Sequence, residues 1–163
     1  MERPSLNHPP LFPNIGKTQT KEVKVVKTQS FDTLVTWSDA ISVDNKVIDD
    51  DHKKLIDAVN ALYAAIHSGG EKLIVVDAFD EMMAYTSYHF GHEEKLMAKA
   101  KYPDIDDHAR QHRGFIEQLG TLYGDFKNGK DVAGRALLNF LKFWLTTHIM
   151  VIDKRLAHYL SSH

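Results

Sequence analysis

The chain has 163 residues, a formal net charge of −2 and no cysteine. This length suits one domain, and the balanced charge argues against a nucleic-acid-binding protein, which normally carries a basic face. The lack of cysteine excludes disulfide frameworks, iron–sulfur clusters and thiol catalysis. Ten histidines are the unusual figure in the composition. Because histidine is the commonest metal-ligating side chain and a frequent proton carrier, the spacing of these residues is the place to look for function.

The N-terminal residues differ from the rest of the chain. Four of the five prolines fall within residues 1–13, which contain no apolar run of the kind that a secretory signal requires. We predict that residues 1–33 form an extended N-terminal arm, with a disordered leader as the alternative, and that residues 34–163 form the folded domain. The most apolar window, residues 140–152, is too short to cross a bilayer. We therefore expect a soluble, cytoplasmic, monomeric protein with no membrane or nucleic-acid partner.

Four stretches of the folded domain carry apolar residues three and four positions apart, as amphipathic helices do. The predicted helices cover, in chain order, residues 49–68, 71–99, 104–127 and 131–161. The turns between them are marked by Gly69-Gly70, by Pro103 and by Gly129. Short turns force neighbouring helices to run antiparallel, so the sequence predicts an all-α fold, an antiparallel up-down-up-down four-helix bundle.

Histidine lies beside an acid or a second histidine in each predicted helix. Residues four apart share a helix face. His89 with Glu93, and His108 with His112, can therefore each direct two donor groups to one place. His52 has no second donor four residues away on the first helix, and in such a place a hydrogen-bonded core histidine is more usual than a ligand.

The last helix has a less regular spacing, because Asp153 follows His148 by five residues. On an ideal helix these two side chains point in different directions. A π-bulge, a feature common at functional positions, would bring them to the same side. Without a bulge, Asp153 would instead form an ion pair with Lys154 or Arg155.

The four helices together offer five imidazoles and two carboxylates, a set that is hard to bury unless its members share metal. This set suits iron, zinc, copper or manganese, and ligand type alone does not choose among them. Seven ligands are too many for one tetrahedral zinc. They fit two octahedral ions if both carboxylates bridge, which leaves one ion with a vacant position for a small molecule. The seven residues are His52, His89, Glu93, His108, His112, His148 and Asp153.

These motifs resemble those of the hemerythrin family, and in particular the bacteriohemerythrins, over about residues 34–159. The matching segments are Trp37, Ile48–His52, His89–Met97, Tyr102–His112 and Trp144–Asp153. The resemblance implies a four-helix bundle with two oxo- or hydroxo-bridged iron ions that bind O2 reversibly. It therefore implies an oxygen carrier, storage or delivery protein and not an enzyme.

The resemblance also implies roles for individual residues. One iron would be bound by His108, His112 and His148, the other by His52 and His89, with Glu93 and Asp153 as bridges. O2 would bind at the two-histidine iron, in an apolar pocket. The pocket residues would be Leu55, Phe90, Trp144, Leu145 and Ile149.

Two residues near the predicted site depart from the family pattern. Asp51 precedes His52 where Gln or Glu is more usual, and His92 is an extra imidazole, which we interpret as a surface residue. We interpret the remaining histidines as solvated; these are His8, His67, His158 and His163.

Three other functions compete with an oxygen carrier. A ferritin-like oxidase is excluded because the chain contains no Glu-x-x-His. A peroxidase or nitric-oxide-handling activity at the same metal site stays open as an alternative. So does an O2 or redox sensor that uses the N-terminal arm.

Overall fold

The computed structural model describes residues 33–69, 71–130 and 133–163, and this part of the chain is helical without strands. The elements in chain order are η1 (Asp39–Ile41), α1 (Lys46–His67), α2 (Lys72–Ala100), α3 (Ile105–Lys127), α4 (Ala133–Thr147), η2 (His148–Asp153) and α5 (Lys154–Ser162). The segment η1 is a 3₁₀-helix and η2 is a π-helix. The predicted all-α bundle is confirmed. The N-terminal arm predicted over residues 1–33 lies, apart from Thr33, outside the described residues.

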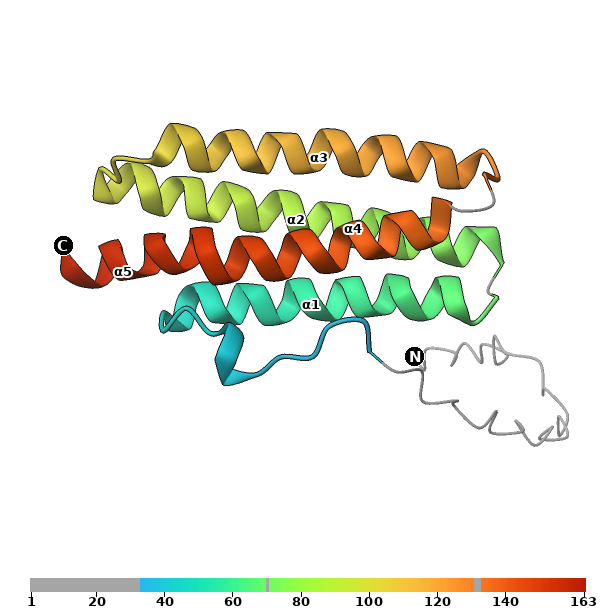
Figure 1. Ribbon diagram of the computed structural model, residues 1–163, viewed down its shortest axis with the longest axis horizontal. Helices are drawn as coiled ribbons and strands as arrows, with labels where there is room; N and C mark the ends of the chain where they lie inside the picture. The colour runs from blue at the N-terminus through green and yellow to red at the C-terminus, as the bar shows by residue number, and fades with distance from the viewer. Residues whose placement is uncertain (1–32, 70, 131–132) are drawn as a thin grey trace, which may run out of the picture. The chain divides into compact units, whose positions relative to one another are not determined.

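Four long rods lie side by side in the bundle, and successive rods run in opposite directions (Figure 1). Three of them are α1, α2 and α3. The fourth is a continuous column in which α4, η2 and α5 follow one another without a turn. In this arrangement α1 packs mainly against α2, and α3 packs mainly against α4. Each rod therefore presents one face to a shared interior, where side chains from all four can meet.

The ends of the helices follow from local chemistry. The side chain of Asn45 accepts hydrogen bonds from the backbone N–H groups of Val47 and Ile48, which caps α1. Lys101 ends α2 in the left-handed conformation, with φ of 55°. Gly129, with φ of 74°, turns the chain after α3, a conformation that glycine adopts without steric cost. These turns fix the lengths of the rods and hence the height at which each ligand side chain lies.

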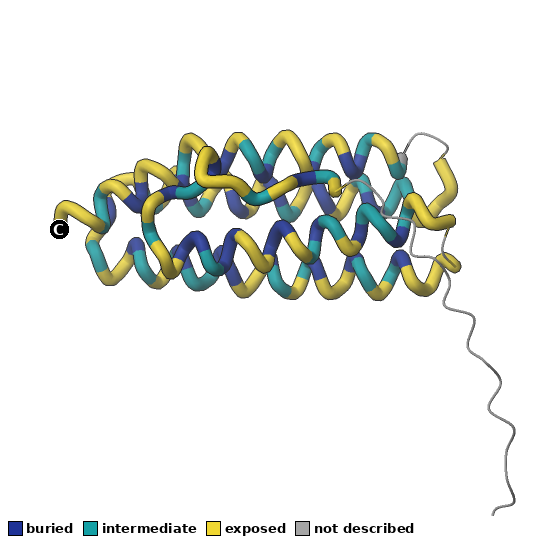
Figure 2. The backbone as a smooth tube through the Cα atoms, turned by 90° about the horizontal axis from the view of Figure 1, so that it is seen from below, coloured by how far each residue is buried: buried dark blue, intermediate teal, exposed yellow. Residues whose placement is uncertain are grey.

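Buried positions line the inward faces of the rods, and exposed positions the outward faces (Figure 2). Part of the interior is aliphatic, with Leu62, Met82, Leu119 and Leu137 fully buried. Elsewhere it is polar, because ten polar or charged side chains are also buried. None of the helices in the described part of the chain is both long and apolar enough to span a bilayer.

The segment before α1 is tied to that helix by side-chain hydrogen bonds. The amide of Asn60 donates to the carbonyl oxygen of Val35 at 2.8 Å and accepts from its N–H at 3.1 Å. Further along, the buried carboxylate of Asp49 accepts from the N–H of Val43 at 2.9 Å and from Ser42 Oγ at 2.7 Å. These contacts hold the first turn of α1 in place, one turn before His52.

Candidate metal centre

All seven predicted ligands meet inside the bundle, and each is at most 4% exposed. They come from all four rods: one from α1, two from α2, two from α3 and two from η2. Their donor atoms form two groups that share both carboxylates, and within each group these atoms lie within 4.8 Å of one another. The three-histidine group consists of Glu93, His108, His112, His148 and Asp153. The two-histidine group consists of His52, His89, Glu93 and Asp153.

In the three-histidine group the Nε2 atoms point at a common centre. His148 Nε2 lies 3.2 Å from the Nε2 atoms of both His108 and His112. Glu93 Oε2 lies 3.3 Å from His112 Nε2 and 3.4 Å from His108 Nε2. Asp153 Oδ1 lies 3.1 Å from His148 Nε2. The donor atoms of this group therefore converge on one place.

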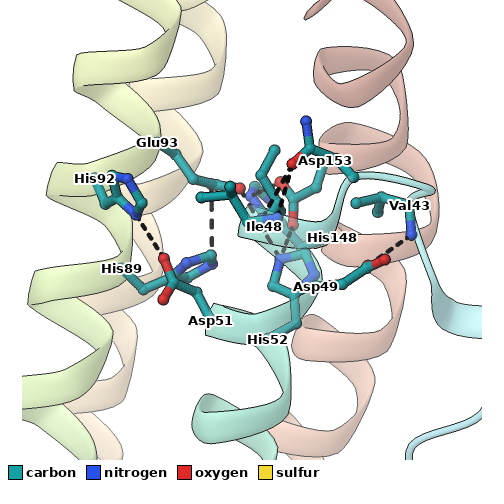
Figure 3. Close-up of polar contacts among 12 residues, drawn as sticks. Val43, Ile48, Asp49, Asp51, His52, His89, His92, Glu93, His148 and Asp153 are labelled. Atoms are coloured by element: carbon teal, nitrogen blue, oxygen red, sulfur yellow. Dashed lines mark hydrogen bonds and ion pairs between the residues drawn. The ribbon is translucent and has the colours of Figure 1, made fainter. Parts of the chain in front are cut away.

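The two-histidine group uses the other side of the same carboxylates. His52 Nε2 lies 3.1 Å from Asp153 Oδ2, while Asp153 Oδ1 faces the three-histidine group. His52 Nε2 and His89 Nε2 each lie 3.9 Å from a Glu93 oxygen. The close-up shows His52 beneath Asp153 and His89 beside Glu93 (Figure 3). Both carboxylates therefore lie between the two groups, as bridging ligands would.

A π-helical backbone brings Asp153 into this position. The whole span from His148 to Asp153 is π-helical. Its wider turn places two side chains five residues apart on the same side, and Asp153 is fully buried. The structure thus has the bulge that the sequence left as one of two alternatives, and Asp153 is turned inward and not toward Lys154 or Arg155.

The electrostatics of the buried cluster favour two carboxylate anions. Burial opposes ionisation of Glu93, and so does the nearby Asp153, but the imidazoles of His108 and His112 outweigh both and lower the pKa of Glu93 to about 2. For Asp153 burial also acts against ionisation, yet its imidazole neighbours, His148 first, hold its pKa well below the usual range. Burial lowers the pKa of His89 to about 4. The two-histidine group therefore combines anionic carboxylates with a neutral imidazole at His89, which suits a bound cation.

At His108, in the three-histidine group, a proton would compete with a metal cation for the same place. Burial lowers the pKa of His108, but the carboxylates of Asp153 and Glu93 outweigh it and raise the pKa to about 9. A positive charge is thus favoured between this imidazole and the two carboxylates. A metal cation at this place would satisfy the same demand without a proton.

Of the five predicted pocket residues, four are buried and Trp144 is partly buried. The two aromatic rings lie against the three-histidine group. Phe90 stacks on His112 with ring centroids 3.8 Å apart, and Trp144 stacks on His148 at 4.2 Å. Phe90 is also 5.8 Å from His89, at a tilt. The pocket assignment at the two-histidine iron stays a prediction, and these stacking contacts point both aromatic rings toward the other group.

His92 is not part of either group of donor atoms. Its Nδ1 lies 2.5 Å from Asp51 Oδ2, and Asp51 Oδ1 accepts from the Tyr85 hydroxyl at 3.0 Å. Burial first, and then the bond to Asp51, raises the pKa of Tyr85 well above its ordinary value. The two residues that depart from the family pattern thus contact each other and link α1 to α2 beside the site (Figure 3).

The other histidines in the described part of the chain are exposed, as predicted. His67, His158 and His163 lie on outward faces. His8 is outside the described residues.

Sequence reasoning missed one contact of the site. Glu94 Oε1 lies 3.2 Å from Nδ1 of His112, on the ring edge that faces away from the cluster. The four-residue spacing in α2 had singled out Glu93 and left its neighbour without a role. The available signal was the pair of adjacent glutamates, but it does not say which partner the second one meets.

The amino-acid sequence matches a known protein family and several of its members. The family model described as hemerythrin HHE cation binding domain matches residues 43–160, well over half of the chain. The chain belongs to the hemerythrin family. It is 32% identical over 130 residues to a bacteriohemerythrin from Stenotrophomonas maltophilia, a match that covers 80% of this chain and 84% of the relative.

Hemerythrin-family relatives from other sources match at similar levels. A bacteriohemerythrin from Methylococcus capsulatus is 30% identical over 122 residues, which cover 74% of this chain and 92% of the relative. Hemerythrin subunit 2 from Golfingia vulgaris is 31% identical over 117 residues, or 72% of this chain and 85% of the relative. The aligned part of the chain is thus the hemerythrin domain, with all four rods of the bundle.

Proposed function

We propose that this hemerythrin-family protein binds O2 reversibly at a di-iron centre formed by the seven buried ligands. The observation that carries the proposal is the arrangement of two donor groups around two shared carboxylates, in the interior of a four-helix bundle. Oxo or hydroxo bridging would complete the link between the ions. The family membership of the chain supports iron and O2 as the metal and the ligand.

The donor atoms fit a pair of cations by their own chemistry. Both oxygens of Glu93 and of Asp153, and Nε2 of His52, are buried and have no hydrogen-bond partner in the part of the chain that the structure describes. Unpartnered buried polar atoms are costly, and buried anions far more so. Metal ions at the two groups would satisfy these atoms at once. The residues present therefore fit the family's di-iron centre.

The ligand count differs between the groups, and this difference supports O2 binding at one side. Three imidazoles with two carboxylates and a bridge fill six positions, whereas two imidazoles with the same partners leave one position vacant. When bound, an iron pair would supply the two electrons that reversible O2 binding requires. Neutral His89, held so by burial, adds no proton to that side.

The surroundings favour binding over turnover. Apart from the ligands and the tyrosines, three polar side chains are buried in the described part of the chain, and each is already hydrogen-bonded: Asp49 to Val43, Asp51 to Tyr85 and Thr86 to the carbonyl of Met82. Tyr123, whose buried hydroxyl has no partner among the described residues, stands eleven residues beyond His112 on α3, about 16 Å along the helix axis. His92, the imidazole nearest in sequence, pairs with Asp51. A peroxidase needs a positioned proton donor. These contacts therefore support a carrier, storage or delivery role.

The proposal can be tested by loading the protein with iron anaerobically and measuring its metal content. The loaded protein is then mixed with O2, and separately with hydrogen peroxide, in a stopped-flow spectrometer. We expect two irons per chain, near-ultraviolet and visible absorption, and an oxygenated species that is stable and reverts when O2 is removed. One metal per chain, or none, would overturn the site. Rapid decay to the diferric form with turnover of hydrogen peroxide would instead identify an enzyme.

A further inference from the structure

The outer edges of the five imidazoles are not alike. Each ligand ring directs Nε2 inward, so Nδ1 is the outer nitrogen. In His52, His89, His108 and His148 this Nδ1 atom is buried and has no hydrogen-bond partner among the described residues. In His112 the outer nitrogen instead lies 3.2 Å from the carboxylate of Glu94. One imidazole of the five thus has an anion behind it.

Adjacent residues of α2 contact both nitrogens of His112. Glu93 Oε2 is 3.3 Å from Nε2, and Glu94 Oε1 is 3.2 Å from Nδ1. The ring of Phe90, one turn earlier on the same helix, stacks flat on the imidazole, with an angle of 3° between the planes. A single helix therefore contacts two edges and one face of the His112 imidazole. These contacts restrict the orientation of this ring more fully than that of the other ligand rings.

The contact also has an electronic consequence. A carboxylate that accepts from the outer N–H fixes the ring as the tautomer whose Nε2 is free for metal, and makes that nitrogen a stronger donor. Stronger donation stabilises the more highly charged ferric ion relative to the ferrous ion. The side chain of Glu94 is 41% exposed and that of His112 is 2% exposed, so the bond runs from a ligand to the protein surface.

We propose that Glu94 is a positioning residue that fixes the orientation and tautomer of His112 and lowers the reduction potential of the three-histidine iron. The inference rests on the proposed di-iron function. Asp51 and His92 provide no equivalent on the two-histidine side, because they lie beside that group but pair with each other (Figure 3). The two iron sites therefore differ in the hydrogen bonding of their ligands as well as in the number of ligands.

Three variants of the iron-loaded full chain test the proposal. Glu94→Gln removes the charge but keeps an acceptor oxygen, and Glu94→Leu removes both. Glu117→Gln is the matched control, since it removes one exposed glutamate charge from α3 without touching a ligand side chain. The measurements are the midpoint potential of the iron pair, the rate of iron loss to a chelator, and the imidazole N–H signals of the zinc-loaded protein in NMR.

We expect a graded response. Glu94→Leu should raise the potential and speed iron loss about tenfold, as removal of such outer partners does at other metal sites. Glu94→Gln should fall between Glu94→Leu and the wild type, and Glu117→Gln should match the wild type. In NMR one N–H signal of the five should shift in the Glu94 variants.

The opposite outcomes are distinct. Equal potentials in Glu94→Gln and Glu94→Leu would mean that charge alone acts, and would overturn the hydrogen-bond assignment. A lower melting temperature or iron content with unchanged potential and N–H signals would reduce Glu94 to a structural contact and overturn the proposal too. The zinc-loaded spectrum decides the assignment even if iron does not bind as proposed, so the two failures can be told apart.

Discussion

The three-histidine and two-histidine groups are built differently although they share both carboxylates. In the first, Phe90 and Trp144 stack on imidazoles, and Glu94 contacts an outer nitrogen. In the second, His52 and His89 meet edge to face at 4.9 Å, and their outer nitrogens have no partner among residues 33–69, 71–130 and 133–163. From this difference we expect the three-histidine group to hold its ion more rigidly and the two-histidine group to be the side that accepts a ligand.

The largest expected effect comes from the bridges, because they belong to both groups. Glu93→Gln should remove most of both irons, whereas Glu94→Gln should keep most of the iron, since Glu94 contacts a ligand but none of the inward-facing donor atoms. Metal analysis after identical loading measures this. Equal losses from the two variants would contradict the orientation of α2 and the shared role of Glu93.

Removing one imidazole from each group should separate the two. His89→Ala leaves five donors in the three-histidine group, and we expect one ion bound tightly and the second weakly. His148→Ala leaves four donors in each group, and we expect both ions to bind weakly. Anaerobic titration with Fe²⁺ distinguishes a biphasic curve from a single weak phase. A single weak phase for His89→Ala would remove the distinction between the groups.

A polar side chain in the predicted pocket should affect oxygen retention more than iron content. Leu55→Asn and Ile149→Asn should each speed autoxidation severalfold because they admit water, while iron content stays near that of the wild type, since neither residue is a ligand. Each also costs about 1–3 kcal/mol of stability through an unsatisfied buried amide.

Leu62→Asn is the control for that loss of stability. Leu62 is equally buried but lies ten residues beyond His52 on the same helix, about 15 Å along its axis. Stopped-flow decay of the oxygenated form is the measurement. Iron loss without faster autoxidation in the Leu55 and Ile149 variants would rule out the pocket assignment.

The smallest expected effect concerns Tyr85, whose hydroxyl donates a hydrogen bond to Asp51 beside the two-histidine group. In the folded chain its pKa lies well above the ordinary value of 10.0, chiefly because of burial. The unfolded chain therefore loses this proton first, and stability is lost as pH rises above 10. Tyr85→Phe should flatten that part of the stability curve. Urea midpoints of the metal-free protein at increasing alkaline pH check this, and identical slopes would contradict the raised pKa.

Much of the fold, and the clustering of the seven buried donor side chains, could be predicted from spacing. Apolar residues three and four apart indicated the four rods, and the pairs His89/Glu93 and His108/His112 indicated shared faces. Helix α1 begins at Lys46 and not at Asp49, because Asn45 caps it. The contacts of Glu94 with His112 and of His92 with Asp51 could not be predicted. They depend on how far α1, α2 and α3 are each rotated about their own axes in the bundle. The spacing of residues within one helix does not determine these rotations.

The π-helical segment determines which face of α5 points into the bundle. Between His148 and Asp153 the backbone fits one residue more than an α-helical turn would hold, and Met150 and Val151 lie exposed on its outer side. The wide turn absorbs that residue, so Leu156 and Ala157 of α5 still face the interior. Deleting Met150 should therefore leave α5 in phase with α4. Inserting a further residue there would turn α5 by about 100° and carry its buried face into solvent.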